Sequence, residues 1–92
     1  MPVTYEGSKP MPTYRSDDGA QVQALKIKLV GELLGGVAMV PEDDSYGNVT
    51  ADFRWVEEQK PAAGGYVVRD GADHWSFVPA PVFEAGYTPV AA

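Results

Sequence analysis

His74, the single histidine of the chain, stands in a short stretch whose side chains could in principle hold a metal ion. Asp70 and Asp73 accompany it, together with Gly71. Aspartate beside glycine is more typical of a turn than of a metal site, because the aspartate side chain accepts hydrogen bonds from backbone groups two residues on. We therefore interpret residues 70–73 as the turn of a hairpin, and we predict no metal and no other cofactor.

No other residues of the sequence have the types and spacing of a known catalytic site. No serine stands in a nucleophile motif that a histidine could serve, and the chain has no cysteine. Glu57 and Glu58 are adjacent, so on a helix they would point about a third of a turn apart and could not act as an acid–base pair. The glycine pairs at 35–36 and 64–65 do not precede a helix as a phosphate-binding loop does. We predict a binding protein and not an enzyme.

Residues suited to binding are more frequent. The chain has two tryptophans and five tyrosines, which combine a stacking face with a polar group, and the planar fork of arginine matches phosphate and carboxylate oxygens. We expect Tyr66, Trp75 and Phe77 to fill the core, whereas Trp55 falls off the apolar stripe of its helix and is available at an interface. The candidate ligand-binding residues are Tyr14, Arg15, Arg54, Trp55, Arg69 and His74.

The charge is unevenly distributed over the 92 residues. Residues 1–41 hold four bases and four acids, whereas residues 42–92 hold three bases and nine acids and so carry the whole net charge of −6. Binding to duplex nucleic acid requires a basic surface that displaces counterions, so we predict no such partner. The acidic half could instead mimic nucleic acid toward a basic protein. The apolar runs are shorter than the roughly 18 residues that cross a bilayer, and no signal peptide is recognisable, so we expect no membrane association.

Hydrophobic patterning predicts a small, β-rich α+β domain of about four or five mostly antiparallel strands with one main helix. Residues 1–20 contain three prolines and two glycines and are expected to form an extended N-terminal arm, followed by a single domain over residues 21–92. Apolar alternation predicts a strand over residues 21–30, with Leu25, Ile27 and Leu29 on one face.

A returning strand is expected over residues 37–40, and a helix over residues 50–60. Thr50 or Asp52 would cap the helix at its N-terminus, and Pro61 would end it, because the residue before a proline is disfavoured in helical geometry. Phe53 and Val56 would form its apolar stripe.

Residues 64–78 are expected to form a hairpin. If Arg69 pairs with His74, one face carries Tyr66, Val68, Trp75 and Phe77, while Arg69 and His74 lie on the other face. A short helical turn through Phe83 and a final strand over residues 87–90 complete the prediction.

The C-terminal half resembles a family of small, mostly uncharacterised bacteriophage and prophage proteins. The segments GGYVVRDG (64–71), WSF (75–77) and FEAGYTPV (83–90) are similar to its pattern P-x-x-G-[GD]-[YW]-[VI]-[VI] … F-E-x-x-Y-x-x-V, with Pro61 at the position of its first proline. A Tyr-Arg pair followed by V-x-A-x-x-[IVW], here residues 14–15 and 22–27, is a second similar feature.

The resemblance implies a non-enzymatic phage accessory protein. We expect an inhibitor of host antiviral defence in the host cytoplasm, acting either as a sponge for a cyclic nucleotide signal or as a mask for a basic host protein. The alternative is a virion component such as a capsid decoration protein. We also expect a homo-oligomer, because the core of so short a chain is thin.

Overall fold

The computed structural model describes residues 3–90. Within this range, no helix is long and apolar enough to cross a membrane. The elements in chain order are β1 (Val3–Tyr5), β2 (Thr13–Ser16), β3 (Gln21–Leu33), β4 (Gly36–Pro41), β5 (Val49–Asp52), α1 (Phe53–Gln59), β6 (Tyr66–Arg69), β7 (Trp75–Val78), α2 (Ala80–Gly86) and β8 (Tyr87–Pro89).

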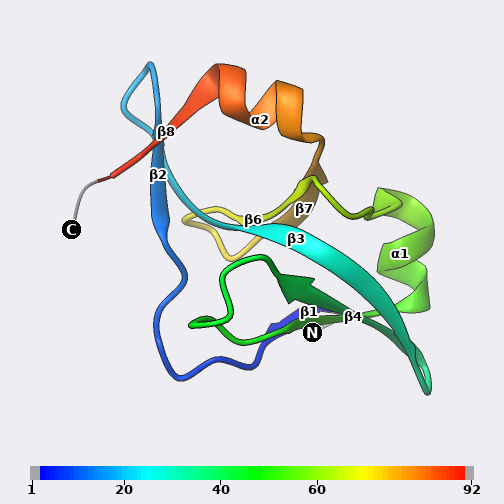
Figure 1. Cartoon of the computed structure of the whole chain (residues 1–92). Helices are drawn as coiled ribbons and strands as arrows, with labels where there is room; N and C mark the ends of the chain where they lie inside the picture. Colours follow the sequence, from blue (N-terminus) through cyan, green and yellow to red (C-terminus); the bar gives the residue numbers. More distant parts are fainter. Residues whose placement is uncertain (1–2, 91–92) are drawn as a thin grey trace.

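The strands of residues 3–90 form one curled antiparallel sheet around the 13-residue strand β3 (Figure 1). β3 pairs with β4 along its C-terminal part, and with β2 and β6 along its N-terminal part. β5 and β1 extend the β4 side, β7 extends the β6 side, and β8 extends the β2 side. The succession β3-β4-β5-α1-β6-β7, curled around one core, is that of a partly open five-stranded barrel of the OB type. This architecture confirms the prediction of a small β-rich α+β protein.

The interior of this barrel holds the larger hydrophobic cluster. Alternate residues of each strand point inward, as Val37 and Met39 do on β4, because successive side chains of a strand lie on opposite faces. Helix α1 closes one end of the barrel with Trp55, which is only 7% exposed. The buried members of the cluster are Val3, Met11, Leu25, Ile27, Val37, Met39, Val49, Ala51, Trp55, Val67 and Trp75.

A second cluster lies on the outer side of β2, β3 and β6, beneath α2. The ring of Phe83 on α2 stacks on Tyr66, with 4.3 Å between ring centroids, and on Tyr87 at 4.7 Å. Tyr14 meets Phe83 edge-on at 5.0 Å. The predicted helical turn through Phe83 and the final strand are therefore both present, and their aromatic residues attach the C-terminal segment to the sheet.

The N-terminal residues are not a separate arm. β1 pairs with β5 and β2 pairs with β3 and β8, so residues on both sides of position 20 share one sheet. Val3 and Met11 are buried in the barrel core. The predicted number of strands is too low for the same reason: eight strands are present within residues 3–90, and some of the added ones are short segments that only long-range pairing stabilises.

Two predictions of which side chains point toward the core, one on β3 and one on α1, are wrong. A β-bulge between Ile27 and Leu29 reverses the alternation of β3, so Leu29 points outward and is 45% exposed. In α1, Trp55 is buried and Phe53 is exposed, the reverse of the prediction, whereas Val56 packs against the core as expected. The helix begins at Phe53 because β5 extends to Asp52, whose carboxylate caps it by accepting the backbone N–H of Trp55 at 2.9 Å.

The hairpin of β6 and β7 forms, but its register differs by one residue from the prediction. The backbone N–H of Asp70 donates to the carbonyl of His74, so the connecting loop has three residues and Arg69 lies opposite Trp75. Asp73 makes this shorter loop possible by adopting a left-handed conformation with φ of 63°. As a result, Arg69 shares a face with Trp75 and Phe77, while Tyr66 and Val68 face α2.

Candidate functional site

The six residues predicted to bind a ligand do not converge. Tyr14 and Arg15 lie on β2, Arg54 and Trp55 lie on α1, and β2 and α1 are on opposite sides of the molecule (Figure 1). Arg69 and His74 belong to the β6–β7 hairpin. Each of these three regions holds at most two of the predicted residues.

The aromatic candidates belong to the packing of the fold. Trp55 is buried, and Tyr14 is half-buried against Tyr66 and Phe83. Burial raises the pKa of the Tyr14 hydroxyl above its usual value. Burial raises the pKa of the neighbouring Tyr66 as well, and a hydrogen bond of 2.8 Å from its hydroxyl to Glu84 Oε2 adds to the shift. These rings are therefore not free to stack on a base.

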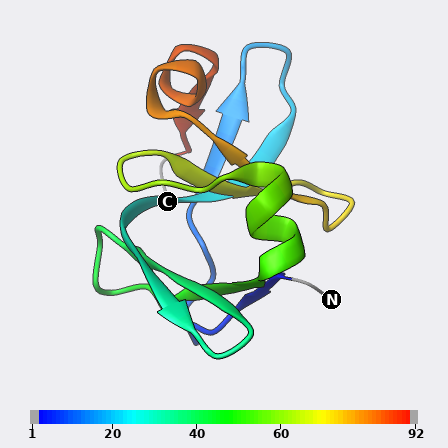
Figure 2. The same ribbon diagram turned by 90° about the vertical axis from the view of Figure 1, so that its right-hand side faces the viewer.

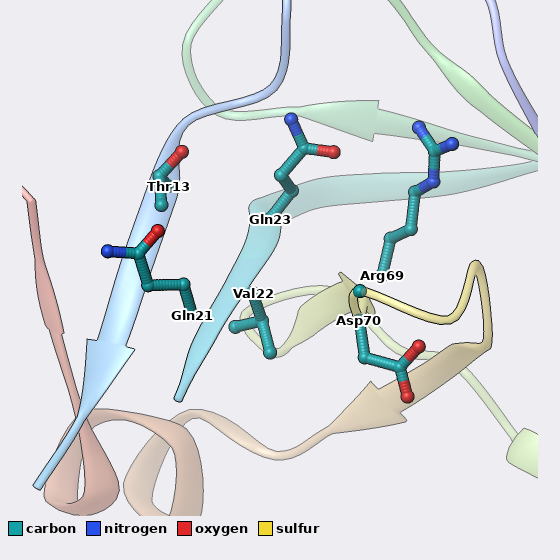
Figure 3. A pocket seen from close by; sticks show the side chains of 7 residues that line it. Thr13, Gln21, Val22, Gln23, Arg69 and Asp70 are labelled. Atoms are coloured by element: carbon teal, nitrogen blue, oxygen red, sulfur yellow. The ribbon is translucent and has the colours of Figure 1, made fainter. Parts of the chain in front are cut away.

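Arg69 lies at a hollow of about 330 Å³ at one end of the barrel (Figure 3). Thr13, Gln23 and Arg69 are direct cross-strand neighbours on β2, β3 and β6, so their polar groups line one side of the opening. The lining residues are Thr13, Gln21, Val22, Gln23, Arg69, Asp70 and Gly71.

The charges at this hollow do not favour an anion. The guanidinium of Arg69 lies over the Trp75 ring and pairs with the Asp73 carboxylate. The carboxylate of Asp70 accepts hydrogen bonds from the backbone N–H groups of His74 and Ala72, which lower its pKa and keep it charged. One guanidinium, already paired with Asp73, and two carboxylates thus lie at the hollow and its rim, so the hollow offers a phosphate no net positive charge. Across residues 3–90, no three His, Cys, Asp or Glu side chains are placed to hold a metal.

A different surface stands out on the other half of the sheet. The outward side chains of β1, β5, β4 and the C-terminal part of β3 form what we call the open face. Gly31, Ala38, Thr50 and Thr4 follow one another directly across these four strands. The open face comprises Thr4, Leu29, Gly31, Leu33, Gly36, Ala38, Val40 and Thr50.

The open face is uncovered within the described chain. Its residues belong to neither core cluster, and among them only Gly36 is buried. By contrast, the outer side of β2, β3 and β6 is covered by α2. The β3–β4 hairpin carries the open face to one end of the molecule (Figures 1 and 2), where Leu33 is 47% exposed and Leu34 is fully exposed.

Sequence reasoning missed the open face, although one signal was present. Leu33 and Leu34 are adjacent and precede the Gly35-Gly36 turn. Because neighbouring residues of a strand point to opposite faces, a pair of leucines at a hairpin tip places at least one of them away from the core.

Two comparisons connect the chain with known proteins, while no family model matches it. The decoration protein of Salmonella phage ST64T is 32% identical over 77 residues, which is 84% of this chain and 58% of that protein. The solution structure of the monomeric form of the phage L decoration protein superposes with a TM-score of 0.67 and 30% identity, covering 85% of this chain and 58% of that one. The chain therefore spans less than two thirds of the length of either relative.

These similarities correct the functional prediction. The expected inhibitor of host defence, with its nucleotide ligand or host-protein target and its place in the host cytoplasm, is wrong, and the virion alternative is favoured. The burial of the aromatic candidates and the scatter of the arginines give the physical reason, because residues 3–90 do not assemble a cluster of stacking rings and free cations. In both sequence and fold, this chain is similar to phage decoration proteins.

Proposed function

We propose that the protein is a non-enzymatic structural component of a phage particle that binds to the outside of the capsid shell. The observation that carries the proposal is the joint similarity in sequence and fold to two decoration proteins over most of this chain. The relationship is stronger than a shared fold alone, because about a third of the aligned residues are identical to those of the ST64T protein.

The structure supports a role in binding through a rigid surface. Two hydrophobic clusters hold both sides of the N-terminal half of β3, and α2 is attached by stacked aromatic rings. OB-type barrels often bind nucleic acid, but they do so with basic grooves and exposed aromatic residues. This chain has 13 acidic and 7 basic residues, and both tryptophans are buried. A protein surface is the better partner.

Self-association remains part of the proposal. The thin core of a 92-residue chain favours assembly with copies of itself or on a larger surface. Light scattering at micromolar concentration measures the mass of the free protein directly. A mass equal to one chain would show that the shell, and not a second copy, supplies the contacts that the thin core lacks.

The decisive experiment is analysis of purified particles of the phage that encodes the chain. We expect the protein in the virion in a fixed ratio to the coat protein, measured by quantitative mass spectrometry. Purified protein should also cosediment with shells that lack it and saturate at a fixed number of copies. If virions contain none of the protein and shells do not bind it, the structural role is wrong.

A further inference from the structure

We infer that the open face, together with the hairpin tip Leu33–Leu34, is the surface that docks on the capsid shell, and that the shell presents an apolar patch with basic side chains around it. This inference rests on the proposed function and adds to it the surface that binds and the chemistry of the partner.

Exposed leucines provide the first argument. Leu29 and Leu33 are about half exposed, and Leu34 is fully exposed, all within one strand and its turn. Single exposed apolar residues are common on protein surfaces, but several along one face and its tip are more typical of an interaction site. A hollow of about 350 Å³ opens next to the tip, and its lining includes Thr4, Glu6, Leu33, Leu34, Thr50 and Asp52.

The two glycines of the open face provide the second argument. A Cβ on Gly36 would collide with the carbonyl oxygen of Ala51, so the fold itself requires glycine there. A Cβ on Gly31 would meet only Leu29 Cδ1, at the ordinary contact distance of 3.9 Å, and its φ is not positive. Glycine weakens the interior of a strand, so its presence at position 31 has no benefit for the fold. It does keep the centre of the open face flat, which allows another surface to approach closely.

Charge identifies the partner. The charged residues that line the hollow, Glu6 and Asp52, are both acidic. On β3, the exposed Glu32 and Lys28 offset each other, so Glu6 and Asp52 decide the sign of the charge at this edge. A second copy docked face to face would bring these acids together, in a chain that already carries a net charge of −6. A basic rim on the shell complements them instead.

Two substitutions test the surface without disturbing the core. Gly31→Lys places a long cation in the centre of the open face, and Leu34→Ser removes a side chain that is fully exposed and contributes little to folding. The matched controls are Gly71→Lys, at an open position in the β6–β7 loop, and Val82→Ser, at an exposed position on α2. Cosedimentation with shells lacking the protein gives the dissociation constant, and thermal unfolding confirms that each variant is folded.

We expect each open-face variant to bind shells roughly tenfold more weakly or worse, with an unchanged melting temperature, while both controls bind as the wild type does. Unchanged binding of Gly31→Lys and Leu34→Ser, with a wild type that binds, would overturn the inference and leave the proposed function intact. Failure of the wild type to bind any shell would overturn both. If ultracentrifugation instead shows that the open-face variants dissociate an oligomer while their shell binding persists, the occupant is a second copy and the inference is wrong.

Discussion

The indole N–H of Trp55 donates a hydrogen bond to the main-chain carbonyl of Trp75, 3.3 Å away in the buried interior of the barrel. This bond links α1 to β7 across 20 positions of the sequence. Both side chains are only 7% exposed. The pair therefore closes this end of the barrel, where α1 is joined to β7 by side-chain packing and not by strand pairing.

Trp55→Phe should lower the free energy of unfolding by about 1–3 kcal/mol or more, because the smaller phenyl ring leaves part of the indole's space empty and the carbonyl of Trp75 loses its partner. Phe53→Ala, two residues away and about half exposed, serves as the control and should cost less than about 1 kcal/mol. Urea denaturation followed by fluorescence of the remaining tryptophan gives both values. Equal losses in the two variants would show that Trp55 does not hold the barrel closed.

Alkaline pH should unfold the protein through Tyr66. Burial and the hydrogen bond to Glu84 raise the pKa of Tyr66 in the folded state, so the folded state retains the proton that the unfolded chain loses near pH 10. The stability that this side chain contributes is complete below about pH 10 and is lost as the pH rises toward the folded-state pKa.

Melting temperatures measured from neutral to strongly alkaline pH should therefore fall less steeply for Tyr66→Phe than for the wild type. Tyr5→Phe is the matched control, because the Tyr5 hydroxyl bonds to the Lys9 carbonyl and Gly47 N–H and is remote from α2. If Tyr66→Phe leaves the alkaline slope unchanged, other groups govern unfolding at high pH.

The register of the β6–β7 hairpin should depend on the backbone of Asp73 more than on its charge. Asp73→Asn retains a side chain that tolerates the left-handed conformation and removes only the exposed ion pair with Arg69, so we expect a change of less than about 1 kcal/mol. Asp73→Val introduces a β-branched residue at φ of 63° and should cost roughly 1–2 kcal/mol or more. Chemical denaturation separates the two outcomes, and similar losses in both variants would assign the register to the ion pair.

Binding to the shell should weaken as salt concentration rises. Salt screens the attraction between the acids beside the open face and a basic rim, but it leaves apolar contacts intact. Neutralising Glu6 with Glu6→Gln should reduce the salt dependence, whereas Glu57→Gln, on the exposed side of α1, should not. Cosedimentation across a salt series measures how the dissociation constant of each variant changes with salt concentration. Binding that strengthens with salt would indicate a wholly apolar contact.

Local signals in the sequence were sufficient for several elements. Pro61 and the Asp52 cap marked a helix that the structure confirms in shortened form, and two short apolar segments on either side of a turn of aspartate and glycine marked the β6–β7 hairpin. The aromatic C-terminal segment was also predicted as a helical turn followed by a strand. These features depend on capping, proline geometry and turn residues, which act over a few neighbouring positions.

The errors arose where a single residue changed which side chains of a whole segment point toward the core. The bulge after Ile27 turned Leu29 outward, and the left-handed Asp73 shifted the hairpin by one position and moved Arg69 onto the face of Trp75. Because side chains of a strand alternate between its two faces, every shift by one residue exchanges the buried and the exposed side chains.

The sequence by itself thus determined the β6–β7 hairpin, α2, β8 and the approximate span of α1, but not β5, and it contains no recognisable catalytic motif. The tertiary structure alone decided that Val3 and Met11 belong to the core, that Trp55 is buried, and that the open face is left uncovered. The reason is that pairing between strands distant in sequence, such as β1 with β5, depends on the curl of the entire sheet, which no local pattern encodes.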